Sequence, residues 1–350
     1  MSDMPASTLA IVAQDAKVSR MTVSRVLRNA ADVSPATRER VWDSIRKLGY
    51  RPNPMVSALM SYVRSGSPKT DAGVLAYLTS GAQEHGWRQH AIYLAFHEGA
   101  RERAESLGYK LEEFWLRQRG ISMARLSRIL YARGICGVIV APLSSSHGHL
   151  NLDWNRFSAV AIGYSLLKPS MSRVSNDQYD SILIALRELR RRGYTRIGLA
   201  MPHRNDRRVN YHWSAGYLSF HQRLQNAKYP QLFLPDAWEK EAALAWVRRQ
   251  RLEAVVSMDP EFLEWLESAG YRLPLDMGFV NLDWSKQFRP CAGIDQRPDE
   301  VGAAAVDVVV GQLNRNKLGI PSIQRNILVP GVWVPGPTVR GKRSSFLRDA

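Results

Sequence analysis

Residues 18–30 have the sequence VSRMTVSRVLRNA, which is the most informative part of the N-terminal segment. Val23, Val26 and Leu27 follow the i, i+3, i+4 spacing that gives a short helix one apolar face. Ser19 fits the N-cap, because its hydroxyl can accept a hydrogen bond from the first free backbone N–H groups. The stretch therefore predicts an amphipathic helix that begins just after Ser19.

The opposite face of this predicted helix is polar and carries side chains suited to base edges rather than to a core: Arg20, Met21, Thr22 and Arg25. A preceding helix is expected with Thr8 as its N-cap and Leu9, Val12 and Ala13 on its inner side. Lys17 and Val18 form the short joint between the two helices. Two short helices joined in this way predict a helix-turn-helix, whose second helix enters the major groove of DNA.

A third helix is predicted to complete this headpiece. Ser34 is placed to cap it, Pro35 suits the first helical position, and Gly49 is expected to end it. Its inner face comprises Val41, Ile45 and Leu48. Amphipathic spacing alone would equally describe a plain three-helix bundle, so the identity of the residues has to separate the two interpretations.

The sequence resembles the lactose-repressor (LacI/GalR) family of bacterial transcription regulators at residues 8–13 (TLAIVA), 22–27 (TVSRVL), 33–41 (VSPATRERV) and 48–53 (LGYRPN). The resemblance is close in the headpiece and looser up to about Thr338. It implies a homodimer that binds a pseudo-palindromic site in double-stranded operator DNA. The expected function is repression of carbohydrate-related genes, with DNA affinity modulated by a small molecule.

The same resemblance assigns roles to residues in the headpiece. Arg20 and Met21 occupy the two positions that dominate sequence choice, where arginine can pair with guanine and methionine can contact a thymine methyl. Arg25 is expected to contact a base. Phosphate contacts that set the register are expected from Ser19, Thr22 and Asn29. Thr8 and Asn53 complete the expected DNA-binding set.

Residues 53–71 are expected to form a hinge helix and a linker. Asn53 can cap the helix, Pro54 can occupy its first turn, and Leu59 matches the position that the family wedges into the minor groove. Pro54 and Met60 depart from the common family pattern. A plain amphipathic linker helix is the alternative.

The remaining chain alternates short apolar strand-like runs with amphipathic helices, which predicts an α/β core with parallel sheets. The resemblance implies a core like that of periplasmic binding proteins, with two lobes. Three crossings between the lobes are expected near Ser175, Asp295 and Gln324. The expected division is a headpiece at 1–52, a hinge at 53–71, a core at 72–338 and a basic tail at 339–350. Lobe 1 is expected at 72–175 and 296–324, and lobe 2 at 176–295 and 325–338.

The effector site is expected in the cleft between the lobes, with a sugar or sugar derivative as the ligand. Tyr93 and Asp283 match family positions that border the ligand, and Tyr164 and Trp284 are added as candidates. Trp213 and Met258 replace the arginine and asparagine that many members use. The tryptophan ring would then stack on a sugar or pack in the core. A core that is closed by its aromatic residues and binds no effector is the alternative.

Composition limits the other classes of function. No apolar run is long enough to span a membrane, the first residues lack a signal-peptide pattern, and the two cysteines suit a reduced compartment, so a cytoplasmic protein is expected. No cofactor or metal motif and no catalytic pair is found, so the chain is not expected to be an enzyme. A solute-binding protein would share the core but not the headpiece.

The net charge of +16 is only partly a property of the headpiece, because residues 1–60 carry 9 Lys and Arg against 5 Asp and Glu. A solvated basic surface is the simplest interpretation. Attraction of the core to phosphates and an anionic effector are the alternatives.

Overall fold

The computed structural model describes residues 9–27, 33–48, 73–144, 148–224 and 229–342. The N-terminal helices and the α/β core form separate compact units. Several predicted features lie outside the described residues: Thr8, Asn29, Asn53, Leu59, the hinge at 53–71 and the end of the tail.

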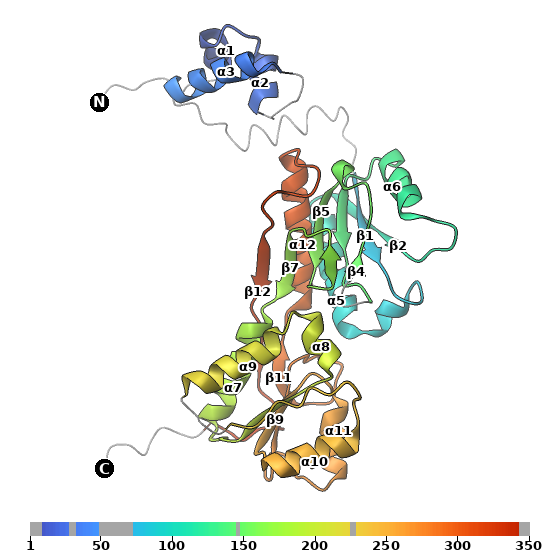
Figure 1. The fold of residues 1–350 in the computed structure, drawn as a ribbon, viewed down its shortest axis with the longest axis vertical. Helices are drawn as coiled ribbons and strands as arrows, with labels where there is room; N and C mark the ends of the chain where they lie inside the picture. Colours follow the sequence, from blue (N-terminus) through green and yellow to red (C-terminus); the bar gives the residue numbers. More distant parts are fainter. Residues whose placement is uncertain (1–8, 28–32, 49–72, 145–147, 225–228, 343–350) are drawn as a thin grey trace, which may run out of the picture. The chain divides into compact units, whose positions relative to one another are not determined.

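The headpiece consists of short helices around a small apolar core (Figure 1). They are α1 (Leu9–Asp15), α2 (Arg20–Leu27) and α3 (Pro35–Leu48). Each helix contributes one apolar stripe, and the buried members are Val12, Ala13, Ala16, Val23, Val26, Val41 and Ile45. The predicted spacing in residues 18–30 is thus confirmed, because α2 turns Val23 and Val26 inward.

Lobe 1 of the core is built on a six-stranded parallel sheet with the strand order β12-β7-β5-β3-β1-β2. Its strands are β1 (Gly73–Thr79), β2 (Tyr109–Trp115), β3 (Gly137–Val140), β5 (Ser158–Ile162), β7 (Arg173–Asn176) and β12 (Asn326–Val329). The helices of this lobe are η1 (Gly86–Gln89), α5 (Ala91–Ser106), α6 (Met123–Ala132), η2 (Trp154–Arg156) and α12 (Pro298–Asn314). The strands β3 and β5 are buried along their whole length, as expected where both faces of a parallel sheet are covered.

Lobe 2 is built on a five-stranded sheet with the order β13-β11-β10-β9-β8, in which only β13 is antiparallel. Its strands are β8 (Ile197–Ala200), β9 (Ala254–Ser257), β10 (Gly278–Asn281), β11 (Ala292–Asp295) and β13 (Val332–Val334). Its helices are α7 (Gln178–Arg191), α8 (His203–Arg208), α9 (His212–Arg223), α10 (Lys240–Gln250) and α11 (Glu261–Ser268). A small sheet pairs β4 (Gly148–His149) with β6 (Leu166–Lys168).

The chain passes between the two large sheets after β7, after β11 and after β12. The position of the third crossing differs from the sequence expectation. That expectation placed the crossing near Gln324 and assigned residues 325–338 to lobe 2. Residues 326–329 instead form β12, which pairs with β7 in the sheet of lobe 1. The chain therefore crosses between Val329 and Val332. The reason is that β12 completes an edge of the first sheet before the chain leaves it.

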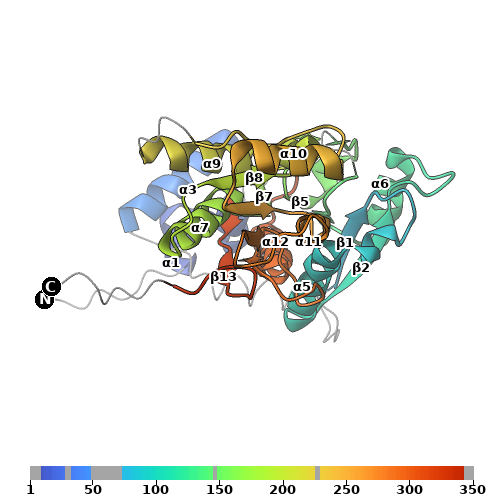
Figure 2. The ribbon, with the colours of Figure 1, turned by 90° about the horizontal axis from the view of Figure 1, so that it is seen from below.

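Two helices of lobe 1 lie side by side, α5 and α12 (Figures 1 and 2). Glycines allow this close approach: the backbone of α12 at Asp299 faces Gly99, and the backbone of α5 at Phe96 faces Gly302. The first turn of α5 also carries Tyr93, so this helix contact helps to position a candidate site residue.

Candidate DNA-binding helix and interlobe cleft

The turn between α1 and α2 is tight and fixed by backbone hydrogen bonds. Lys17 adopts a left-handed conformation with φ of 51°, and the Val18 N–H donates to the carbonyl of Ala13 at 3.0 Å. This bond satisfies one of the free carbonyls at the end of α1. The predicted joint at residues 17 and 18 is thus the place where the chain reverses direction.

The start of α2 is capped as the sequence predicts. The Thr22 N–H donates to Ser19 Oγ at 3.0 Å, and the two hydroxyl oxygens lie 2.9 Å apart. Arg20, Met21 and Arg25 are exposed, and Met21 keeps 60% of its surface accessible to solvent. The side chains that are predicted to contact bases are therefore accessible on this face of α2.

The first and third helices are held together by one carboxylate. Asp15 accepts hydrogen bonds from Lys47 Nζ and Ser44 Oγ, both at 2.7 Å. The bonds from Lys47 and Ser44 lower the pKa of the Asp15 carboxyl. The capped start of α3 at Ser34, whose Oγ accepts from Thr37 N–H at 3.3 Å, agrees with the prediction.

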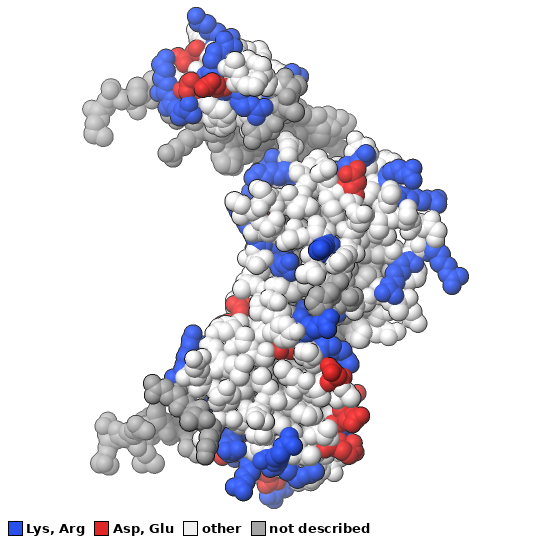
Figure 3. Space-filling view, viewed as in Figure 1, with Lys and Arg blue, Asp and Glu red and all other residues white. Residues whose placement is uncertain are grey.

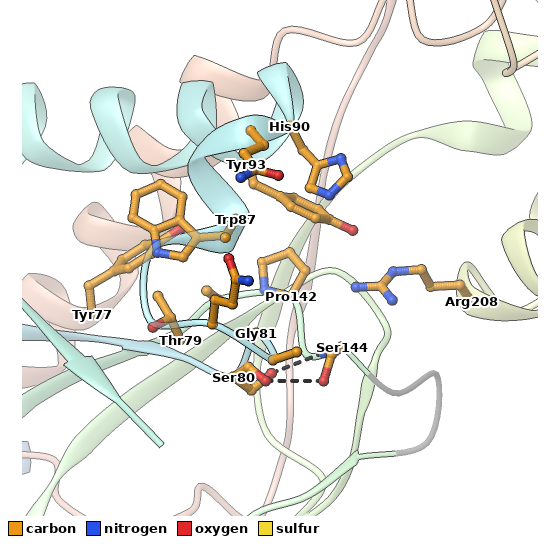
Figure 4. Close-up of a pocket in the computed structure, with 15 residues that line it drawn as sticks. Tyr77, Thr79, Ser80, Gly81, Trp87, His90, Tyr93, Pro142, Ser144 and Arg208 are labelled. Carbon is orange, nitrogen blue, oxygen red and sulfur yellow. Dashed lines mark hydrogen bonds between the residues drawn. The ribbon is translucent and has the colours of Figure 1, made fainter. Parts of the chain in front are cut away.

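A cleft of about 460 Å³ opens in the core between lobe 1 and helix α8 of lobe 2 (Figure 4). Its floor is formed where β1 and β3 end, at Ser80, Gly81 and Pro142. One wall comes from η1 and α5 and carries Trp87, His90 and Tyr93. Ligands of open α/β folds bind beyond the carboxyl ends of parallel strands, so this position is the one expected for a ligand site.

Arg208 reaches this cleft from lobe 2. Its Nη2 donates to the carbonyl of Leu143 in lobe 1, and its guanidinium carbon lies 5.8 Å from the centre of the Tyr93 ring. Figure 4 shows the guanidinium directed toward Tyr93 and Pro142. The two serines on the floor are joined by hydrogen bonds, from Ser144 N–H to Ser80 Oγ at 2.9 Å and from Ser144 Oγ to the Ser80 carbonyl at 3.1 Å.

Of the six predicted effector residues, only Tyr93 lines this cleft. Of the two alternatives for Trp213, the structure shows packing in the core, which corrects its place among the candidate effector residues. Its side chain is fully buried in lobe 2 among apolar side chains of α7 and the sheet. Met258 packs against the same cluster, and Trp284 packs against the cluster on the other side of the sheet. Neither of them lines the cleft.

Asp283 follows β10 and is half-buried. Its N–H donates to Asn281 Oδ1 at 2.8 Å, and Gln296 Nε2 lies 3.5 Å from Asp283 Oδ1. Burial raises the pKa of this carboxyl to about 6, because the charged form loses its hydration. The carboxyl does not line the cleft described above.

Tyr164 lines a different cavity, of about 430 Å³, together with Arg173 and Arg207. Arg173 lies over the Tyr164 ring at 5.1 Å from its centre, and His212 meets the ring edge-on at 4.8 Å. The predicted effector set is thus divided between a cleft, a second cavity and the core of lobe 2.

Sequence reasoning missed Arg208, Trp87, His90 and the serines of the cleft floor. In the sequence, Arg207 and Arg208 are two of many basic residues outside the headpiece, and nothing in their spacing separates a cleft arginine from a surface one. Within the described ranges, no group of three His, Cys, Asp or Glu side chains is arranged to hold a metal ion. On the face that Figure 3 shows, Lys and Arg are spread over the headpiece and both lobes rather than gathered in one patch.

Residues 8–53 match the family described as "Bacterial regulatory proteins, lacI family". The match to this family covers these residues, which we call the lacI-family segment. The lacI-family segment is 52% identical over 56 residues to the HTH-type transcriptional regulator GalS of Salmonella typhimurium, covering 16% of each chain. The sucrose operon repressor of Escherichia coli is 31% identical over 143 residues, which cover 37% of this chain and 43% of that protein. The chain thus matches less than half the length of these curated relatives.

Solved structures extend the similarity in fold beyond the lacI-family segment. The transcriptional regulator CelR in complex with cellobiose has a TM-score of 0.57 at 20% identity, covering 95% of this chain and 99% of that one. The Lac repressor dimer bound to operator and the anti-inducer ONPF has a TM-score of 0.54 at 19% identity, covering 96% and 100%. The core therefore has the fold of these regulators. None of the helices in the described part of the chain has the length and apolarity needed to cross a membrane.

Proposed function

We propose that this chain is a cytoplasmic, sequence-specific DNA-binding transcription regulator. The observation that carries the proposal is the lacI-family headpiece, in which α2 presents Arg20, Met21 and Arg25 to solvent while its other face forms the headpiece core. A helix exposed in this way can enter the major groove, where side chains of these types discriminate bases.

The proposal includes a homodimer on a pseudo-palindromic operator, because a two-fold pair of headpieces places two such helices on successive half-sites. Repression of carbohydrate-related genes is the finer part of the proposal. It is supported by the names of similar proteins, which include a sucrose operon repressor and a regulator solved with cellobiose. The interlobe cleft is proposed as the site of the small-molecule effector.

The test is selection of binding sites from random double-stranded DNA by the full chain, followed by anisotropy titrations at two salt concentrations. The expected result is an enriched pseudo-palindrome, bound by two chains as measured by light scattering on the complex. Arg20→Ala is expected to relax the preference at one symmetric base pair by about 1–3 kcal/mol, since a bidentate arginine–guanine contact is lost.

Arg128→Ala is the matched control, because Arg128 is exposed on α6 of the core. It is expected to leave the preference unchanged. A selection without an enriched sequence would refute DNA-binding specificity. An unchanged base preference for Arg20→Ala would refute the role of Arg20.

A further inference from the structure

The lining of the interlobe cleft is unbalanced in charge. Its side chains are aromatic, amide, hydroxyl, imidazole and guanidinium groups, and none of the lining residues that the structure describes is an Asp or a Glu. Sites that bind neutral sugars need acceptors for the hydroxyl protons, and carboxylates are the strongest such acceptors. This cleft offers one permanent cation and, among its described lining residues, no carboxylate.

The cation is Arg208, and it is only partly compensated. In the part of the chain that the structure describes, Arg208 forms no ion pair with a carboxylate, and its guanidinium donates to the neutral carbonyl of Leu143. Arg192 shows the contrast: its guanidinium is buried in lobe 2 and pairs with Glu188. A half-buried guanidinium that faces a cavity without a carboxylate is a ready partner for an anionic ligand.

Local backbone geometry fixes the place of this cation. Helix α8 ends at Arg208, and the next turn holds Asn210 and Tyr211 at φ of 56° and 62°, conformations that are costly for residues with a Cβ. The turn is held by Asp206, whose carbonyl accepts from Tyr211 N–H at 2.9 Å and whose Oδ1 accepts from Ser214 N–H at 3.2 Å. Strained turns of this kind are concentrated at functional sites.

The rest of the cleft suits a ring. Tyr93 lies beside the guanidinium, and His90 meets the Tyr93 ring edge-on with the ring centres 5.5 Å apart. The hydroxyls of Ser80 and Thr79 line the floor. The volume of about 460 Å³ is within the usual range for small-molecule sites. An aromatic face next to a cation and hydroxyl groups accommodates a polyhydroxylated ring that bears one negative group.

We propose that the ligand of this cleft is a sugar acid, whose carboxylate pairs with Arg208 and whose ring lies against Tyr93. This proposal rests on the proposed function, because it names the chemical class of the effector. One guanidinium matches the single charge of a carboxylate, whereas a phosphate dianion usually requires more donors. The ligand carboxylate replaces the Leu143 carbonyl as the partner of Arg208. The new hydrogen bond is stronger because it is charge-assisted, and it joins a side chain of lobe 2 to a ligand bound on lobe 1.

The test is calorimetric titration and thermal shift of the full chain against matched pairs: glucuronate with glucose, and galacturonate with galactose. Glucose 6-phosphate tests the phosphate alternative. At least one acid is expected to bind 10-fold or more tighter than its neutral partner. Arg208→Gln is expected to remove that advantage, and Arg208→Lys, which keeps the charge without the planar fork, to retain part of it.

Arg207→Gln is the matched control, since the neighbouring Arg207 lines the other cavity rather than this cleft. It is expected to bind the acid as the wild type does. The proposal is overturned if a neutral sugar or the phosphate binds best, if no acid of the panel binds, or if Arg207→Gln rather than Arg208→Gln loses binding. Operator affinity of the ligand-free protein is measured in parallel, so failure of the sugar-acid proposal is distinguishable from failure of DNA binding.

Discussion

The close contact of α5 with α12 gives a sharp test of how lobe 1 is packed. A Cβ placed on Gly302 would lie 2.0 Å from the carbonyl oxygen of Phe96 and 2.8 Å from the backbone nitrogen of Ala100. Real Cβ atoms do not come closer than about 3.0 Å to such atoms. The obstacle is backbone, so no side-chain rotation can relieve the clash. In the Gly302→Ala variant the helices must therefore separate by about 1 Å.

Overpacking of this kind lowers the free energy of unfolding by about 1–3 kcal/mol. Because the obstacle is rigid backbone, Gly302→Ala is expected at or above the upper end of this range. The higher helix propensity of alanine returns about 1 kcal/mol. We expect a net loss of about 2–3 kcal/mol in the free energy of unfolding. In a chain of this size the corresponding fall in Tm is about 2 °C for each kcal/mol, or about 4–6 °C in total. Ligand affinity is also expected to fall, because α5 carries Tyr93.

Gly311→Ala is the matched control on the same helix. The nearest atoms to its Cβ belong to the flexible tip of the Arg315 side chain, at 3.3 Å. The alanine is therefore expected to leave stability unchanged or to raise it by up to about 1 kcal/mol. Urea denaturation and calorimetry of both variants give the comparison. Equal Tm values for the two variants would refute the inferred close packing, because helix propensity alone would then explain both.

Three further predictions concern single side chains. Asp283→Asn is expected to stabilise the protein by up to about 3 kcal/mol above pH 6. The folded-state pKa of about 6 lies above the ordinary value of 3.8, so stability is lost as pH rises through that window. Urea unfolding at pH 4, 6 and 8 should show this loss in the wild type and not in the variant, and a parallel pH dependence would contradict it. Trp213→Ala is expected to cost about 3–5 kcal/mol, because a fully buried ring is removed from lobe 2, and a change below about 1 kcal/mol would contradict its place in the core. Asp15→Ala is expected to speed hydrogen exchange in α1 and α3 at pH 7 while leaving that of the core unchanged, and equal acceleration in both units would disprove a local role.

The sequence predicted those elements whose local pattern and burial agree. The headpiece helices follow from apolar spacing and from the caps Ser19 and Ser34, because the same residues that define the pattern also form the core. The short apolar run at 254–257 predicts a buried strand, and β9 occupies these residues. The sequence pattern predicts a helix from Ser181 to Arg192. Helix α7 begins three residues earlier, at Gln178, because Asp177 caps it.

Other elements lack a local signal. Helix α9 was not predicted, because Gly216 interrupts it and apolar or aromatic residues occur on most of its faces. That composition suits its surroundings, where Gly216 allows close approach to Ile182 and Tyr217 is buried. Strand β12 was also missed, because Ile327 and Leu328 are both exposed and no alternation marks the strand. Its existence depends on pairing with β7, which is distant in sequence.

The candidate site shows why residue roles that are carried over from a family resemblance have to be checked against the fold. The resemblance predicts that Trp213 replaces an arginine that many members of the family use to bind a ligand, and the structure buries that ring in lobe 2. The cation of the cleft comes instead from Arg208, five residues earlier and on the preceding helix. A tryptophan that packs in the core has to be buried, whereas a cation that binds a ligand has to face the cleft. The strained turn at Asn210 and Tyr211 separates α8, which carries Arg208, from α9, which carries Trp213. A cleft can therefore lose the usual cation at one position and keep a positive charge, which is why the apolar replacement at 213 does not by itself argue for an empty core.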